Sequence, residues 1–246
     1  MNLSAETMEG LFDALPDVVF FVKDPQARYT HVNLTLVRRL GLKRRDQVIG
    51  HSVESLFPPA LGRSFAEQDQ HVLAGVRIDN QLEVHVFPNR APGWCLTRKL
   101  PVEQRGRIVG LIGISRDLGL PDMRHPVYAR LQRANEHLQQ HYGEKVRVQN
   151  LADLSGMSVA QLERHFRRVF QLTPQQVLAR YRIEAAMQLL REPGSVADIG
   201  MSCGFTDQSA FARQFKATVG MTPRDYRQLL LTSPPHAVSR GQAEAG

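Results

Sequence analysis

The stretch that decides the fold of the C-terminal half is 151–174, LADLSGMSVAQLERHFRRVFQLTP, and it recurs in altered form at 196–223, VADIGMSCGFTDQSAFARQFKATVGMTP. The Leu-x-Arg-x-Phe motif at 162–166 corresponds to Phe-x-Arg-x-Phe at 211–215, which lies 49 positions later. Each copy begins with a short apolar segment ending in glycine and finishes with Thr-Pro. An internal repeat of this kind indicates one supersecondary unit used twice. The pattern predicts helix, glycine turn, helix, which is the arrangement that places a helix in the major groove of DNA.

The net charge of +7 is concentrated in the half that holds the repeat. Residues 1–123 carry 15 Lys and Arg against 14 Asp and Glu, a difference of +1, whereas residues 124–246 carry 16 against 10, a difference of +6. A basic excess on one half of a protein favours a polyanionic partner for that half.

Length and composition are typical of a globular protein with about two domains. Of the 246 residues 42% are hydrophobic and 22% charged, and no run of 18 apolar residues predicts a membrane span. The acidic first 13 residues argue against a secretory signal. Cys95 and Cys203 are isolated from each other, which gives neither a metal-binding spacing nor an expected disulfide. We therefore expect a cytoplasmic protein with no bound metal.

The first half alternates short strand-like and helix-like segments. Apolar runs predict a strand at 18–22 with a hairpin partner at 29–32, and Gly106 marks a hairpin turn near the end of the domain. This order predicts an antiparallel α+β domain over 14–118, preceded by a helical lead-in at 1–13. The further expected segments are strands at 77–87, 94–102 and 107–115 and helices at 34–40 and 65–73.

The second half is expected to be entirely helical. Residues 119–127 lack periodicity and carry two prolines, so they are predicted to be a linker to an all-α domain at 128–231. Capping patterns of the type Ser/Thr-x-x-Gln/Asp, beginning at 158, 173, 195 and 222, predict helix N-termini in this domain. The small and polar tail at 232–246 is predicted to be disordered.

In both copies of the repeat, the helix after the glycine turn has an apolar face and a polar face. The core-facing residues are expected to be Leu162, Phe166 and Val169 in the first copy and Phe211, Phe215 and Val219 in the second. The polar faces are predicted to contact DNA through Ala160, Glu163, Arg164 and Arg167 in the first helix and Gln208, Ser209, Ala212, Arg213 and Lys216 in the second.

The chemistry of these side chains divides them into two groups. Arginine makes bidentate contacts with guanine and glutamine with adenine, so Arg164, Arg213 and Gln208 are the predicted base readers. Arg167, Ser209 and Lys216 are expected to contact phosphate or to vary with the site. For any single residue the alternative is an ordinary solvated polar face.

A long helix is predicted at 174–191, between the two copies. Its 18 residues would span about 27 Å at 1.5 Å per residue. This length is close to the roughly 34 Å between successive major grooves on one face of DNA. We therefore hypothesise that one chain fills two adjacent major grooves without dimerising.

Residues from about 130 to 230 resemble the DNA-binding domain of the AraC/XylS family of bacterial transcription regulators. The resemblance is carried by the glycine turn before Met157-Ser158, by the segment 204–216 and by the closing GMTPxxYR at 220–227. It implies a seven-helix bundle whose base contacts fall on Ala160, Glu163 and Arg164 in the first motif and on Gln208, Ser209, Ala212 and Arg213 in the second. Ala160 and Glu163 depart from the bulkier or neutral residues often found there, which shifts site choice toward the second helix or Arg164.

Residues from about 14 to 118 resemble a PAS sensor domain. The resemblance is carried by LPDV at 15–18 leading into a strand, by VIG at 48–50 before LFP at 56–58, and by GRIVG at 106–110 leading to ISRD at 114–117. It implies a five-stranded antiparallel sheet whose concave face can hold a small molecule.

The identity of such a molecule is open in the sequence. Tyr29, His85, Trp94 and Arg98 are predicted to line a pocket for a small polar or anionic effector, and no cofactor is predicted with it. One alternative is a filled core in a domain that only dimerises. Another is a haem or flavin redox sensor, for which His71 is a candidate haem ligand, although Cys95 lacks the context of a flavin-adduct motif.

The combined interpretation is a sequence-specific DNA-binding transcription regulator in which an effector in the first domain alters the strand at 108–115 and, through the linker, the DNA-binding domain. Its expected partners are promoter DNA, RNA polymerase and a second copy bound through the first domain. No zinc signature, phosphate-binding glycine loop, nucleophile elbow or mechanistic carboxylate pair is present, so no enzymatic activity is predicted.

Overall fold

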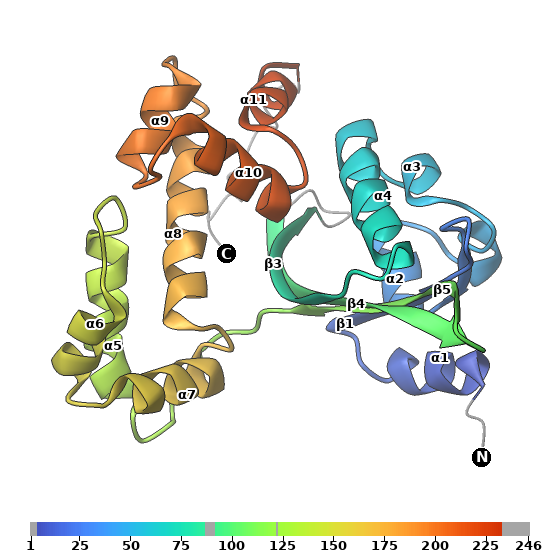
Figure 1. Cartoon of the computed structure of the whole chain (residues 1–246), viewed down its shortest axis with the longest axis horizontal. Coiled ribbons are helices and arrows are strands. Elements are labelled where there is room, and N and C mark those ends of the chain that lie inside the picture. The colour runs from blue at the N-terminus through green and yellow to red at the C-terminus, as the bar shows by residue number, and fades with distance from the viewer. Residues whose placement is uncertain (1–3, 87–91, 122, 233–246) are drawn as a thin grey trace, which may run out of the picture.

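The computed structural model describes residues 4–86, 92–121 and 123–232. An antiparallel sheet with flanking helices is followed by a helical domain (Figure 1). The strands are β1 (Val18–Lys23), β2 (Tyr29–Val32), β3 (Ile78–Val86), β4 (Pro92–Gln104) and β5 (Arg107–Asp117). The helices of the N-terminal half are α1 (Ala5–Asp13), α2 (Leu34–Arg39), η1 (Arg45–Gln47), α3 (Val53–Leu56) and α4 (Pro59–Leu73). Those of the C-terminal half are α5 (Tyr128–Gln140), α6 (Val148–Ser155), α7 (Val159–Val169), α8 (Pro174–Leu189), α9 (Val196–Ser202), α10 (Gln208–Val219) and α11 (Pro223–Thr232).

The five strands follow the order β2-β1-β5-β4-β3, and all neighbouring pairs are antiparallel. This confirms the predicted α+β fold class with a five-stranded antiparallel sheet. Side chains alternate across a strand, so the two faces of β1 have different neighbours. Phe20 stacks on Phe12 of α1, with ring centroids 4.6 Å apart, whereas Val19 and Phe21 point into the cluster that α3 and α4 cover. Figure 1 shows α1 on one side of the sheet and α3 and α4 on the other.

Several predicted elements differ from the observed ones at their ends. The helix expected at 65–73 begins at Pro59, because a proline in the first helical turn loses no hydrogen bond. The strand expected at 94–102 continues to Gln104, since Arg105 and Gly106 both have positive φ and form a tight hairpin turn into β5. The strand expected at 18–22 extends by one residue to Lys23, whose side chain is buried.

The helical domain contains the predicted repeat. The α6–α7 and α9–α10 pairs are the two helix-turn-helix units, and Figure 1 shows α8 running between them. Gly156, at the turn of the first unit, adopts the left-handed conformation with φ of 60°. Gly200 lies where α9 crosses α10, and a Cβ atom there would come within 2.9 Å of the Phe211 side chain. Both glycines therefore perform the roles expected of a close helix crossing.

The predicted capping patterns also begin helices. Ser158 and Thr173 form complete capping boxes with Gln161 and Gln176, at α7 and α8. Ser195 caps α9 through its side chain. At α11 the hydroxyl of Thr222 accepts a hydrogen bond from the backbone of Asp225 at 3.2 Å.

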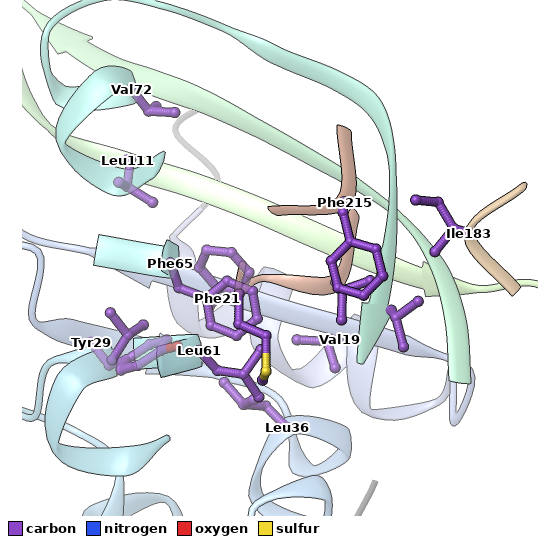
Figure 2. Packing of buried hydrophobic residues seen from close by; sticks show 14 of the residues in the cluster. Val19, Phe21, Tyr29, Leu36, Leu61, Phe65, Val72, Leu111, Ile183 and Phe215 are labelled. Carbon is purple, nitrogen blue, oxygen red and sulfur yellow. The ribbon is translucent and has the colours of Figure 1, made fainter. Parts of the chain in front are cut away.

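Two apolar cores cross the boundary between the halves of the molecule. One core joins the concave face of the sheet to Ile183 of α8 and to Phe211 and Phe215 of α10 (Figure 2). The other joins α5, α6 and α7 to Leu82 and Leu96 of β3 and β4. The strand pair β3–β4 is consequently in contact with the helical domain through both cores.

The domain limits 14–118, 119–127 and 128–231 remain predictions. Residues 118–121 form no regular secondary structure, and α5 begins at Tyr128. The lead-in at 1–13 contains α1, and the predicted disordered tail lies outside the described residues, apart from Thr232 at the end of α11.

Candidate functional sites

The exposed face of α7 carries the residues predicted to read DNA in the first unit. Leu162, Phe166 and Val169 are fully buried and fix the orientation of the helix. The opposite face then exposes Ala160, Arg164 and Arg167. Glu163 is half-buried and lies 3.8 Å from Arg167, one helical turn later. The arrangement presents two guanidinium groups on one helix face, together with one carboxylate.

The N-terminal part of α10 is exposed in the same way. Asp207 caps the helix by accepting a hydrogen bond from the backbone of Ala210 at 2.8 Å. This hydrogen bond is the largest cause of a lowered pKa of the Asp207 carboxyl. Gln208, Ser209 and Arg213 are exposed, and Ala212 is half-buried. The predicted base readers of the second unit, Gln208 and Arg213, are therefore exposed to solvent.

The C-terminal end of α10 is docked on the N-terminal domain. Lys216, which was expected to face solvent, donates to Glu67 of α4 at 2.6 Å. Gln81 of β3 donates to the carbonyl of Ala217 at 3.1 Å. Gly220, which ends the helix, lies so close to Leu61 of α4 that a Cβ atom would be 2.6 Å from that side chain. Lys216 can make the predicted contact with a DNA phosphate only if its ammonium group first leaves Glu67.

The N-terminal domain encloses a cavity of about 230 Å³ between the concave face of the sheet and the helices α2, α3 and α4. Its walls are mainly apolar, and several of the lining side chains are labelled in Figure 2. A water molecule occupies about 30 Å³ of the liquid, so the cavity has room for a small organic molecule. The lining residues are Val19, Phe21, Lys23, Tyr29, Leu36, Arg39, Leu40, Val53, Leu56, Phe57, Pro58, Leu61, Phe65, Glu83, His85, Thr97, Lys99 and Ser115.

Two buried lysines share one buried carboxylate at this cavity. Asp69 of α4 pairs with the ammonium group of Lys23 and accepts from that of Lys99 at 2.7 Å. Burial lowers the pKa of Lys23 to about 8, in spite of the attraction of Asp69. Burial alone would raise the pKa of Asp69, but Lys99 and Lys23 outweigh it and the pKa is lowered. The Lys23 ammonium also lies 4.2 Å from the centre of the Tyr29 ring, within the range of a cation–π contact.

A second polar group of the cavity is centred on Glu83 of β3. Its carboxylate accepts hydrogen bonds from Gln68 at 2.7 Å, from Gln81 at 3.0 Å and from the hydroxyl of Thr97. His85 lies 3.3 Å from the same carboxylate. Burial would lower the pKa of His85, but Cys95 and Glu83 outweigh that effect and raise the pKa to about 10.

Of the four residues predicted to line a pocket, Tyr29 and His85 do so. Trp94 and Arg98 do not line this cavity, although Trp94 lines a second pocket together with residues of the helical domain such as Arg180 and Tyr181, and ligand binding by any of the four residues remains a prediction. Arg98 is exposed and forms an ion pair with Asp79 at 3.0 Å. Trp94 packs toward the helical domain, where the guanidinium of Arg180 lies 5.6 Å from its ring centre. Successive side chains of a strand point to opposite faces of the sheet. Residues 94, 96 and 98 of β4 therefore share the face that points away from the cavity.

The cavity residues that the sequence analysis missed are polar residues on the inward face of the sheet. Lys23, Glu83, Thr97, Lys99 and Ser115 line the cavity, and none was a candidate. The register of the strand pairs would have identified these residues. Glu83 pairs with Cys95 and Thr97 pairs with Ser115, so these residues lie beside one another across neighbouring strands. His71, considered as a haem ligand, is exposed near the end of α4 and does not line the cavity.

Within the described parts of the chain, no helix has the length and apolar character needed to cross a membrane.

Parts of both halves of the chain match known protein families. Residues 151–229 match a family described as a helix-turn-helix domain, and residues 12–120 match one described as the PAS fold. The HTH-type transcriptional activator RhaS of Enterobacter sp. (strain 638) is 37% identical over 101 residues, and RhaS of Citrobacter koseri is 38% identical over 101 residues. Each alignment covers 41% of this chain and 36% of the relative, so the chain matches little more than a third of the length of these activators.

Solved structures also resemble parts of the molecule. An AraC-type transcriptional regulator from Chromobacterium violaceum is 26% identical, with 43% of this chain and 96% of that chain covered and a TM-score of 0.41. The VqmA–ligand–DNA complex of Vibrio cholera is 23% identical, with 74% of this chain and 89% of that chain covered and a TM-score of 0.44.

Proposed function

We propose that this chain is an AraC-type, sequence-specific transcription regulator controlled by a small molecule in its PAS cavity, because residues 151–229 match a helix-turn-helix family and residues 12–120 match the PAS fold. The observation that carries the DNA-binding part is the pair of helix-turn-helix units. Each unit exposes an arginine near the centre of a helix whose opposite face is buried, Arg164 in the first unit and Arg213 in the second. The basic excess of the same half favours a polyanionic partner.

DNA recognition is assigned to the two exposed helix faces. Arg164, Arg213 and Gln208 read base edges, because their side chains can make bidentate contacts in the major groove. Arg167, Ser209 and Lys216 contact the phosphates, which fix position without reading sequence. The helix α8 between the units has 16 residues, or about 24 Å. This length is about 10 Å shorter than the roughly 34 Å between successive major grooves on one face of DNA. The occupation of two adjacent major grooves by one chain remains our hypothesis, which the footprint of a single bound chain tests.

Selection of binding sites from a random pool of duplexes tests the DNA-binding part. The full chain should enrich one sequence, and Arg213→Ala should weaken binding to it by about 1–3 kcal/mol, or roughly 5- to 150-fold, with relaxed preference at one base position. Arg224→Ala removes the same charge from an exposed position on α11 and is the matched control. It should weaken binding to selected and scrambled duplexes equally. Failure to enrich any sequence would contradict this assignment.

We assign effector control to the PAS cavity because two residues that line it are connected to α10, one through a single intervening side chain and one directly. Glu83 lines the cavity and accepts from Gln81, which also donates to the carbonyl of Ala217 in α10. Leu61 lines the cavity and contacts the end of the same helix at Gly220. A molecule that moves either residue changes the docking of α10. It thereby shifts the population between the docked and the DNA-bound arrangement.

The last strand offers a second route from the cavity to the helical domain. Ser115 of β5 lines the cavity, and the adjacent Arg116 donates to Gln171, between α7 and α8, at 2.7 Å. This contact lies near the end of β5, the strand that was predicted at 108–115 to transmit effector binding to the DNA-binding domain. The two routes reach different helix-turn-helix units, so they are separable by mutation.

Two measurements on the purified full chain test the effector part. Mass spectrometry of the denatured protein should release a co-purified small molecule, and the visible spectrum distinguishes this outcome from a bound haem or flavin. Removal of that molecule should change the affinity for the selected duplex and lower the unfolding midpoint. If no molecule is released and no candidate raises the midpoint, the PAS domain serves only in dimerisation. A homodimer and RNA polymerase complete the proposed partners.

A further inference from the structure

A carboxylate, an imidazole and a thiol meet beside the PAS cavity. Three possible ligand atoms lie within 4.8 Å of one another: a carboxylate oxygen of Glu83, a ring nitrogen of His85 and the Sγ atom of Cys95. The hairpin geometry brings them together, because Glu83 and Cys95 are register partners and His85 follows two residues after Glu83 on the same face of β3. From this juxtaposition we propose that Glu83, His85 and Cys95 bind a divalent transition-metal ion such as Zn²⁺, with one coordination position open to the cavity.

The donor set fits this class of ion. Thiolate and imidazole select Zn²⁺ and Co²⁺ over Mg²⁺ and Ca²⁺, which prefer oxygen ligands. Bonds from Zn²⁺ to these atoms measure about 2.0–2.3 Å, so ligand atoms in a tetrahedral site are roughly 3.5 Å apart. The present separations of up to 4.8 Å therefore close by about 1 Å on binding, which side-chain rotation within the rotamer wells can supply.

The net charge of the site also fits. Metal binding would release the protons of the Cys95 thiol and the His85 imidazolium, because ligands coordinate in their deprotonated forms. An ion of charge +2 bound by one thiolate, one carboxylate and a neutral imidazole then forms a neutral unit, which can be buried without an uncompensated charge. Lys99 is a cation close enough to influence the Glu83 carboxyl, and its ammonium is engaged by Asp69 at 2.7 Å. Cys95 is completely buried, so its thiol is screened from solvent.

The groups around Glu83 are arranged as the outer shell of a metal site. Gln68 and Gln81 both donate to one carboxylate oxygen, at 2.7 Å and 3.0 Å. The hydroxyl of Thr97 donates to the other oxygen. Such hydrogen bonds hold a ligating carboxylate in a fixed orientation. They leave the face of the carboxylate toward His85 as the place for an ion.

The fourth coordination position faces the cavity. Glu83 and His85 line the cavity, whereas Cys95 lies behind them. Three protein ligands with one position left open are typical of zinc sites that accept a water or a ligand atom. The metal site requires neither DNA binding nor a particular effector, and a small molecule with a nitrogen or oxygen donor could complete it.

Cobalt titration of the untagged, metal-free full chain tests this proposal. We expect one Co²⁺ per chain, with a thiolate-to-cobalt charge-transfer band that Zn²⁺ abolishes. Cys95→Ser should remove the band, and His85→Ala should weaken binding at least tenfold. Cys203→Ser is the matched control, because Cys203 is also a buried free cysteine but lies outside the cluster, and it should bind Co²⁺ like the wild type.

A measurement without variants protects the test against misfolding of a mutant. X-ray absorption at the zinc edge of the wild-type chain should show one sulfur ligand and otherwise nitrogen and oxygen ligands. A site with no sulfur, a cobalt band that persists in Cys95→Ser, or the absence of stoichiometric Co²⁺ binding would overturn the proposal. Each of these results is independent of DNA binding, so failure here is distinguishable from failure of the regulator assignment.

Discussion

The ion pair between Lys216 and Glu67 predicts that a mutation in the PAS domain strengthens DNA binding. Lys216 lies on α10 and donates to Glu67 of α4 at 2.6 Å. Glu67→Gln removes the charge that holds Lys216 and frees the lysine for a phosphate. The side chains of Lys216 and Glu67 are 40% and 57% exposed. An exposed pair of this kind contributes about 0.2–1 kcal/mol, so the affinity for the selected duplex should rise by roughly 1.4- to 5-fold.

Fluorescence anisotropy with the selected duplex measures this effect in a double-mutant cycle. Glu67→Gln should raise affinity in the wild-type background and have no effect in Lys216→Ala, and the gain should shrink as salt screens the exposed pair. Glu54→Gln removes the same charge from another exposed position of the PAS domain and controls for net charge. Equal gains from Glu54→Gln and Glu67→Gln, or a gain that survives in Lys216→Ala, would refute the reasoning.

Two further predictions concern stability. Gly200→Ala should lower the unfolding free energy by about 1–3 kcal/mol, because the new methyl group would lie within 2.9 Å of the Phe211 side chain. Gly10→Ala, in open space on a helix, should be neutral or stabilising, so equal losses in urea unfolding of the two variants would argue against the close crossing. The pKa of Lys23 is about 8 in the folded chain against 10.5 in the unfolded chain, so the unfolded chain holds more protons between these values and stability rises with pH there. Relative to Lys23→Met, the wild type should gain on the order of 2 kcal/mol between pH 7 and pH 9.5, and a flat difference across that range would contradict the buried, destabilised ammonium.

The helical domain followed from its sequence because each rule there is local. A face of Leu162, Phe166 and Val169 at helical spacing has one way to be buried. Glycine at 156 marks a turn that requires positive φ. These signals need no knowledge of distant contacts, and both helix-turn-helix units lie where the repeat placed them.

The cavity was harder to predict because its chemistry opposes the usual pattern of a strand. Polar residues of a half-buried strand normally face solvent, yet Thr97 and Lys99 face the interior while Arg98 and Trp94 lie on the outer face. The sequence alone did not show which face of β4 lines the cavity, so Trp94 and Arg98 were predicted there, whereas the structure places Thr97 and Lys99 on the cavity face. The ammonium group of Lys99 is paired with Asp69, which is 30 residues away in the sequence and becomes its neighbour only in the folded chain.

The contacts between the domains could not be predicted from the sequence for a similar reason. The pairing of Lys216 with Glu67 joins residues 149 positions apart, and no periodicity or motif specifies it. The cluster of Glu83, His85 and Cys95 depends on the register of β3 and β4, which is set by the whole sheet.

A hydroxyl-radical footprint of the full chain on its selected duplex shows whether one chain places both recognition helices on DNA. The chain is used at a concentration where one chain binds one duplex. Two exposed recognition helices joined by α8 predict two protected patches on the same face of the duplex, about one helical turn apart, from a single chain. Arg213→Ala should weaken the patch of the second unit and spare that of the first. A single patch shorter than one helical turn, or protection that appears only when two chains bind, would contradict the account.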